Sequence, residues 1–530
     1  MKNLKKYILV LGVAALGACS DDFLDTQPIT TVTESNFYRT PEDAFTALVG
    51  CYDGLQTIWA AGVSFPVASE ILSDNAYGGT GAADDFKYQM IDEFDLSRSP
   101  STQNLYADNW SAYYKAVFRC NTLISKMDQI DWTGNEELRI SYESEARFLR
   151  AFFYFDMVRL WGNIPLLTEP SAENIPQASP DSVYQVIAED LKFAADNLPD
   201  VSYSSQNTAT YGRVTKWAAE AMLARVYLYY TGYYGKPDLV GVVDKAQTLA
   251  YLEDLIANGG FGLVEDFADL WPAASLADYA GEDNKETVFA IKYTYTSDYN
   301  GNTDGNHWLV LLGMREQAVY PYGNGWGGAT VTPDLWNAYN ENDLRRTATI
   351  ISIEDEDLDF TSQSKQREYT GYYNKKYTPL VDEEGNTVVD GLGIGDFQIS
   401  QFQDFVSIRY ADVLLMAAEL GSANAQTYFD AVRRRAYKDS FASIPVTKDN
   451  LMKERRLELA FEGIRYWDLL RQGVSVAAST IAETTTVLNA GTATTKTISA
   501  SNIEQTNGLQ QIPINQINLS NGTLQQNTGW

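Results

Sequence analysis

The sequence predicts a mainly α-helical protein: a tetratricopeptide-like helical superhelix with a variable loop-rich segment and minor short β-hairpins. Three observations lead to this prediction. Apolar residues make up 45% of the 530 residues, as in a globular chain. Both halves repeat apolar residues every three or four positions, which is the spacing of an amphipathic helix. Between the halves the composition shifts towards Gly, Asn, Asp and Tyr, which favours loops.

The N-terminal segment is predicted to target and anchor the protein. A lysine-rich start and a short apolar run lead to a Leu-Gly-Ala-Cys motif that ends at Cys19 and resembles the bacterial lipobox. We therefore predict a lipoprotein signal peptide over residues 1–18, lipidation of Cys19 and a lipid-anchored tether over residues 19–40. The alternative is ordinary secretion, with Cys19 as a spacer residue. The helical domain is then expected over residues 41–530.

Helices are predicted through most of the first half. Thr40 can cap a helix that begins at Pro41, because a threonine oxygen accepts backbone N–H groups and proline suits the first turn. The same apolar spacing predicts further helices over residues 66–73, 104–127, 136–161, 181–197, 214–231 and 244–258. Helix pairs with short joins are typical of tetratricopeptide-like hairpins, although the strict 34-residue period is absent.

Residues 261–403 are predicted to form a long irregular excursion with short β-like runs such as residues 288–295. Loops on a rigid scaffold usually carry specificity, so we expect the variable ligand face within about residues 260–405.

Aromatic residues in this excursion are the candidate ligand contacts. A Trp or Tyr ring can cover the apolar C–H face of a sugar, while Asn and Asp bond its hydroxyls. The alternative is that these rings belong to the core. The predicted contacts are Trp271, Tyr295, Tyr299, Trp308, Tyr320, Tyr322 and Trp326, with Tyr293 in the same stretch and Tyr77, in a predicted loop over residues 74–81, as a weaker candidate.

Helices return at residues 410–420, 425–437 and 450–470, and residues 474–501 are predicted to be a hairpin or loop. The strongest pattern is the stretch Glu454–Gly473. Gly463 lies inside it, where glycine costs ~1 kcal/mol relative to alanine, so we expect another element to pack closely there.

The charges of this stretch predict local ion pairs. Arg465 lies three residues from both Glu462 and Asp468, a spacing that brings side chains together on a helix. We interpret the whole stretch as an amphipathic packing helix.

Signals for catalysis and for cofactors are weak. His307 is the single histidine, and no phosphate-binding glycine loop, HExxH or GxSxG motif is present. We expect no enzyme and no cofactor. Weak calcium binding by Glu354–Asp359 stays open, although a solvated acidic loop is preferred because the EF-hand glycine and spacing are missing.

Net charge limits the expected partners, and the cysteine content limits the expected cross-links. The formal net charge of −30 repels phosphate backbones, so nucleic acid is not an expected partner. Cys51 and Cys120 both follow an apolar helical pattern, so two buried thiols are preferred to a disulfide, which an oxidising compartment would allow.

Several separate stretches resemble the SusD/RagB family of surface lipoproteins. The closing residues after Gln511 resemble the family's usual ending, with Thr528 and Trp530 where the family has Pro and Tyr. The other matching stretches, in order, are CSDDFLD after the lipobox, IRYADVLLMAAE (408–419), AVRRRA (431–436) and ERRLELAFEGIRYWDLLRQG (454–473).

The resemblance implies an α-rich, non-catalytic protein that captures oligosaccharide or polysaccharide at the cell surface. It implies a SusC-like TonB-dependent outer-membrane transporter as partner, over which the lipoprotein closes as a lid. Asp21 and Asp22 after Cys19 favour display on the cell exterior. The alternatives are peptide or other cargo and, less favoured, glycoside hydrolysis. The signature charges are interpreted as scaffold: Arg409, Asp412, Glu454, Arg456, Glu462, Arg465 and Asp468.

Overall fold

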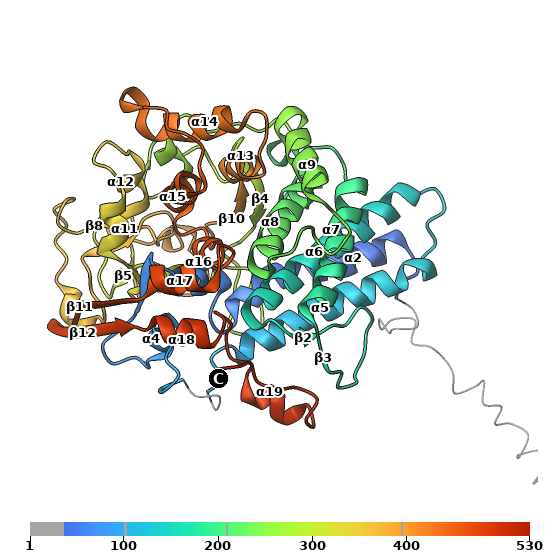
Figure 1. The fold of residues 1–530 in the computed structure, drawn as a ribbon, viewed down its shortest axis with the longest axis horizontal. Coiled ribbons are helices and arrows are strands. Elements are labelled where there is room, and N and C mark those ends of the chain that lie inside the picture. The colour runs from blue at the N-terminus through green and yellow to red at the C-terminus, as the bar shows by residue number, and fades with distance from the viewer. Residues whose placement is uncertain (1–36, 100–102, 208–209, 394–395) are drawn as a thin grey trace, which may run out of the picture.

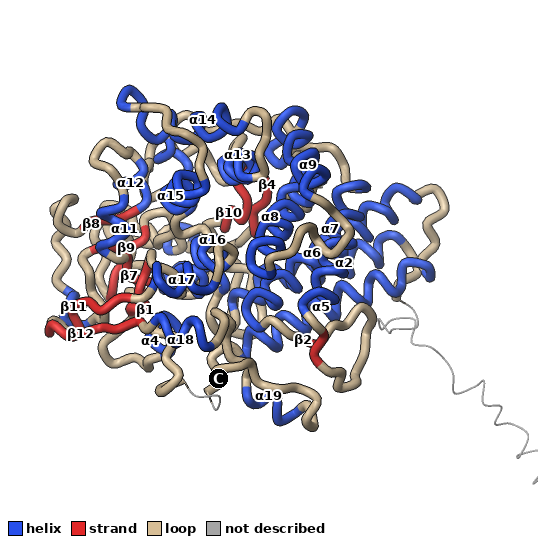
Figure 2. Tube along the Cα trace, viewed as in Figure 1, coloured by secondary structure: helices blue, strands red, loops and turns tan. Residues whose placement is uncertain are grey.

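The computed structural model describes residues 37–99, 103–207, 210–393 and 396–530. The predicted signal peptide, Cys19 and most of the predicted tether lie outside these residues. The first half of the chain forms a stack of long helices on one side of the molecule (Figure 1). The excursion and the C-terminal part form the other side, where most of the strands lie (Figure 2). The predicted mainly helical fold is confirmed.

The long helices of the first half pack on one another in chain order. Helix α2 begins with the predicted cap: Thr40 Oγ1 accepts from the Asp43 N–H at 3.3 Å, and the Asp43 carboxylate accepts from the Thr40 N–H at 3.0 Å. The helices of this half are α2 (Pro41–Ala60), α3 (Phe65–Ile71), α4 (Lys87–Asp92), α5 (Ala107–Lys126), α6 (Glu136–Trp161), α7 (Pro180–Asn197), α8 (Lys216–Tyr234) and α9 (Lys245–Asn258).

The second half combines short helices with strands. Its helices are α10 (Leu309–Leu312), α11 (Pro333–Ala338), α12 (Arg345–Thr349), α13 (Tyr410–Glu419), α14 (Ala425–Tyr437), α15 (Lys448–Leu459), α16 (Arg465–Leu470), α17 (Val474–Ile481), α18 (Ala500–Gln505) and α19 (Ile514–Leu519). No helix among the described residues is long and apolar enough to cross a membrane.

The strands of the described residues form two-stranded sheets only, so each sheet joins segments rather than forming a layer. The pairs are β1 (Ala76–Gly79) with β7 (Gly328–Val331), β2 (Ile164–Pro165) with β3 (Gln177–Ala178), β4 (Thr287–Ile291) with β10 (Phe405–Arg409), β5 (Met314–Arg315) with β6 (Asn324–Gly325), β8 (Ile350–Ser352) with β9 (Tyr372–Asn374), and β11 (Glu483–Asn489) with β12 (Thr492–Ile498).

The predicted continuous helix over residues 450–470 is wrong. It breaks between α15 and α16, where Phe461 has a φ of 65° and Gly463 a φ of 71°, both outside the helical region. A Cβ on Gly463 would lie 3.3 Å from the Pro66 Cα, so the predicted close packing is confirmed. The glycine serves a left-handed turn pressed against α3 rather than a helix interior.

Two predicted loops contain regular structure instead. Residues 74–79 were expected to be a loop, but Tyr77 lies in β1, opposite Thr330 of β7. Residues 474–501 contain helix α17, the β11–β12 hairpin and the start of α18, so the hairpin prediction holds for only part of the range.

Candidate functional site

The predicted ligand contacts divide into two sets of four. Trp271, Trp308, Tyr322 and Tyr77 are core residues with at most 4% of their surface exposed, and Tyr293 is also buried. The Trp308 indole N–H donates to the Tyr293 hydroxyl at 3.2 Å inside the protein. These rings are packed inside the protein, so they offer no open face to a ligand in this structure.

The other four rings are exposed and define what we call the aromatic loop face: Tyr295, Tyr299, Tyr320 and Trp326, with 37%, 71%, 49% and 37% of their surface exposed. The Tyr299 hydroxyl donates to an Asp396 carboxylate oxygen at 3.0 Å. Tyr295 lies edge-on to Phe402 with ring centroids 6.0 Å apart. We retain the ligand-contact prediction for these four residues.

Backbone hydrogen bonds hold the Trp326 loop against its neighbours. The Trp326 N–H donates to the Val310 carbonyl at 3.0 Å, and the Thr80 N–H donates to the Gly327 carbonyl at 2.7 Å. A Cβ at Gly325 would lie 2.3 Å from the Val310 carbonyl oxygen, so only glycine allows this approach. Strand β1, which contains Tyr77, therefore adjoins the Trp326 loop, although the Tyr77 ring itself is buried.

Phe86 lies near the Trp326 loop and was missed by sequence reasoning. Its ring is 45% exposed, and the Arg367 guanidinium stacks 3.9 Å from its centroid. Arg315 pairs with Asp84 at 3.3 Å and links this loop to the one that carries Trp326. The Gly- and Asp-rich composition that marked Tyr77 continues to Phe86, so extending the predicted loop past Gly81 would have found it.

A groove of about 600 Å³ lies beside the loop that carries Tyr295 and Tyr299, within the usual size range of ligand sites. Helix α2 supplies its apolar wall, which includes the exposed Phe45 and Val49. Thr294 and Asp304, from the same loop as the two tyrosines, supply part of the polar wall. An extended ligand on Tyr295 and Tyr299 would therefore have this groove next to it.

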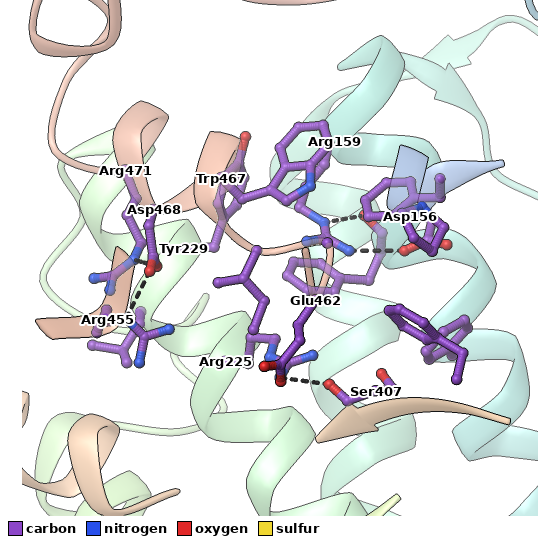
Figure 3. A pocket seen from close by; sticks show the side chains of 18 of the residues that line it. Asp156, Arg159, Arg225, Tyr229, Ser407, Arg455, Glu462, Trp467, Asp468 and Arg471 are labelled. Atoms are coloured by element: carbon purple, nitrogen blue, oxygen red, sulfur yellow. Dashed lines mark hydrogen bonds and ion pairs between the residues drawn. The ribbon is translucent and has the colours of Figure 1, made fainter. Parts of the chain in front are cut away.

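A second cavity, deep between α6, α8 and α16, is too small for a sugar (Figure 3). Its volume is about 40 Å³, which is room for a few water molecules. Tyr229 Oη and Arg225 Nε border it and have no hydrogen-bond partner among the described residues, so bound water suits them. Arg159 crosses beside it, 4.9 Å from the Trp467 ring centroid.

The signature charges form buried pairs between distant segments, so the predicted local pairs of Arg465 are wrong. Arg465 instead donates to both Asp74 carboxylate oxygens, at 2.7 and 2.8 Å. Glu462 accepts from Arg409 at 2.8 Å and pairs with Lys376 at 2.7 Å. The turn between α15 and α16 separates Glu462 from the helical register that the prediction assumed.

The buried charge pairs form a network whose electrostatics favour the ionised forms of Asp468 and Glu458. Burial opposes ionisation of Asp468, but Arg455 and Arg471 hold the pKa of that carboxyl at about 2. Burial likewise opposes ionisation of Glu458, yet the guanidinium groups around it keep its pKa well below the usual range. These side chains are buried and paired, as expected of the scaffold role predicted for the signature charges.

Metal binding finds little support in the described part of the chain. Asp92, Glu93 and Glu368 are the one group of three acidic ligands gathered there, and Lys496 Nζ already pairs with all three at 2.6–3.0 Å. The acidic run Glu354–Asp359 is not gathered around a common point. His307 bonds Ser297 at 3.0 Å, and burial lowers its pKa.

Two family models match separate parts of the chain. A model described as "SusD family" matches residues 353–530, and one described as "Starch-binding associating with outer membrane" matches residues 52–228. The second description names binding, in agreement with the prediction that the chain is not an enzyme.

Relatives and solved structures match nearly the whole chain. SusD-like protein P2 of Formosa agariphila is 26% identical over 501 residues, covering 89% of this chain and 91% of the relative. A SusD-like protein of Bacteroides ovatus is 27% identical, covering 88% and 82%. Surface glycan-binding protein A of Bacteroides fluxus superposes with a TM-score of 0.77 at 25% identity, covering 93% and 100%.

The corresponding protein of Bacteroides thetaiotaomicron, solved in complex with laminarihexaose, gives a TM-score of 0.74 at 25% identity, again covering 93% and 100%. The agreement of motifs, both family models, relatives and fold leads to one conclusion. The chain belongs to the SusD/RagB family of SusD-like proteins.

Proposed function

We propose that this protein is a surface-anchored glycan-binding lipoprotein that holds oligosaccharide on its aromatic loop face. The observation that carries the proposal is the exposure of four large rings on loops whose backbones are fixed by hydrogen bonds. Exposed aromatic patches mark interaction sites, because leaving them in water is unfavourable. Sugar rings present apolar C–H faces that such rings can cover.

The surroundings of these rings suit hydroxyl groups. Asp396 bonds to Tyr299, and Asp304 lies in the same loop as Tyr299. The pair of Asp84 and Arg315 lies beside the Trp326 loop. A ligand face without exposed Trp or Tyr would favour peptide cargo, so the four exposed rings favour a glycan. One solved neighbour is a laminarin-binding SusD-like protein and another was solved with laminarihexaose, so those glycans are the first to test.

We place the protein on the outer membrane, facing the cell exterior. Cleavage after residue 18, lipidation of Cys19 and the tether over residues 19–40 provide the anchor, since acyl chains add ~0.8 kcal/mol per buried methylene. The family description that names association with the outer membrane supports this location. A SusC-like TonB-dependent transporter is the partner that would receive the captured glycan.

Trp326→Ala tests the proposal. Protein comprising residues 20–530 is titrated with laminarihexaose and with plant, microbial and host oligosaccharides by isothermal calorimetry. Removing one stacked ring should weaken binding by about 1–2 kcal/mol, or about 5–30-fold. The matched control is Phe118→Ala, which removes an even more exposed ring (50% against 37% for Trp326) from α5 and should leave affinity unchanged.

Two results would count against glycan binding at this face. The first is the absence of binding to every glycan class offered, which would redirect attention to peptide cargo. The second is an affinity that survives Trp326→Ala and each of the three tyrosine substitutions.

A further inference from the structure

Helices α2 and α5 run antiparallel, in a register that hydrogen bonds between them define. At one end, the Asn109 side chain near the start of α5 donates to the carbonyls of Ile58 and Ala61 at 3.1 and 2.7 Å. At the other end, Arg119 near the end of α5 donates to the Gly50 carbonyl at 3.0 Å. The beginning of α2 therefore faces the end of α5.

The two helices approach each other closely at Gly54 and Ala116. A Cβ built on Gly54 would lie 2.9 Å from the Ala116 Cβ, closer than real Cβ contacts, so the missing side chain allows the approach. Cys51 lies about one turn before Gly54, and Cys120 lies about one turn after Ala116. Because the two helices are antiparallel, one turn back from Gly54 and one turn forward from Ala116 lead towards the same end of the helix pair. Cys51 and Cys120 therefore lie opposite each other, one turn away from the contact between Gly54 and Ala116.

The thiols themselves are in contact. Both side chains are fully buried, and both cysteines are present as free thiols, as the sequence predicted. The pKa of the Cys120 thiol is raised by burial and by its hydrogen bond with the Cys51 thiol.

We propose that Cys51 and Cys120 are a cross-linking site, at which a disulfide joins α2 to α5 once the protein is in oxidising surroundings. A low-molecular-weight disulfide such as glutathione disulfide serves as oxidant. One cysteine thiolate attacks it and releases one glutathione; the second cysteine then displaces the other. The new Cys51–Cys120 bond replaces the oxidant's S–S bond, and both glutathione molecules leave as thiols.

The cross-link would fix a wall of the candidate groove. Phe45 and Val49 of α2 border that groove, while Cys51 points from the same helix into the core. A bond to α5 would hold this helix in place and would restrict the unfolded chain between residues 51 and 120. The oxidised state in the cell depends on the proposed exterior location, but the ability of the two thiols to join does not.

Peptide mapping tests the cross-link on the full chain, produced with its own leader in a bacterium that has an outer membrane. Thiols are blocked with N-ethylmaleimide under denaturing conditions, before and after incubation of the native protein with glutathione disulfide. We expect a linked peptide pair containing Cys51 and Cys120, with neither cysteine labelled. Complete labelling of both after the oxidant, in the native state and in mild urea that opens α2, would overturn the proposal.

Thermal unfolding with and without reductant gives a second readout. The cross-linked protein should lose on the order of 5 °C on reduction, because the loop it closes is long. The control is the double variant Cys51→Ala/Cys120→Ala, whose melting temperature should not respond to reductant. A cross-linked protein that binds no glycan would contradict the proposed function and leave the cross-link standing.

Discussion

The network of buried charges and the aromatic loop face use opposite residue types in opposite places. In the network, charged side chains such as Arg409 and Glu458 are almost completely buried and bonded to one another. On the loop face, Tyr299 and Trp326 leave apolar rings in water. Buried charges are tolerated only when paired, so every member of the network constrains its partners. Exposed rings constrain little, and the ligand face is therefore free to differ between relatives.

The two regions also differ in how they connect the chain. Charge pairs of the buried network reach across long distances in sequence and often share partners: Arg345 pairs with Glu458, and Arg465 pairs with Asp74. The loop face also joins distant segments, but it does so through single hydrogen bonds, such as Thr80 N–H to the Gly327 carbonyl and the Tyr299 hydroxyl to Asp396. Substitutions in the first region should act on folding, and those in the second on binding alone.

Removing Glu458, at the centre of the network of buried charges, should cause the largest loss of stability. Glu458→Ala would leave Arg345, Arg409 and Arg435 without a shared buried partner, at a cost of about 3–5 kcal/mol in the free energy of unfolding. Urea denaturation measures this cost. The control Glu189→Ala removes an exposed carboxylate from α7 and should change stability by under about 0.5 kcal/mol. A comparable small change for Glu458→Ala would break the distinction between the regions.

Two tryptophans of the excursion provide the sharpest contrast. Trp271→Ala should cost roughly 3–5 kcal/mol of stability, because the ring is buried beside Tyr377. Its remaining folded fraction should bind glycan with unchanged affinity, measured by calorimetry well below the melting temperature. Trp326→Ala should leave stability unchanged and should weaken glycan binding. If Trp271→Ala leaves stability intact but abolishes binding, the assignment of that ring to the core fails.

Acid should unfold the protein through the signature charges. The pKa of Asp468 is about 2 in the folded state, below the value of about 3.9 in an unfolded chain. The stabilisation is therefore complete above about pH 4 and is lost as the pH falls towards 2, amounting to roughly 2 kcal/mol. Asp468→Asn should be less stable at neutral pH and should show a shallower loss below pH 4. Parallel curves for both proteins would contradict this.

Exposed ion pairs on the surface should contribute least to stability. Lys192 and Asp196 form an exposed pair at 2.6 Å, one turn apart on α7. Lys192→Ala should change the free energy of unfolding by less than about 0.5 kcal/mol, because water and salt screen the pair. A loss above 1 kcal/mol in thermal unfolding would mean that exposure is a poor guide to the role of charge here.

Periodic segments were predictable from sequence and turn geometry was not. Helix α6 has the predicted bounds, Glu136–Trp161, because its apolar spacing continues without interruption. The break before α16 was missed because Gly463 fits a helical pattern, and its φ of 71° depends on contact with α3. The pairing of Arg465 with Asp74 was missed because sequence spacing reveals only local partners.

The candidate site was predictable only in part, for a related reason. Composition located the loops that carry Tyr299 and Trp326, since Gly, Asn and Asp favour turns. Composition cannot say whether a loop packs back onto the core, so it did not separate the buried Trp271 and Trp308 from the exposed rings. The sequence did not reveal Phe86, because its position depends on a tertiary contact with Arg367.

The most direct test is the affinity of the protein for its best glycan after all four exposed rings are replaced by alanine at positions 295, 299, 320 and 326. Calorimetry should show binding weakened by about 100-fold or more, which corresponds to roughly 2.8 kcal/mol, with an unchanged melting temperature. An affinity within threefold of the unaltered protein would contradict glycan capture by the aromatic loop face.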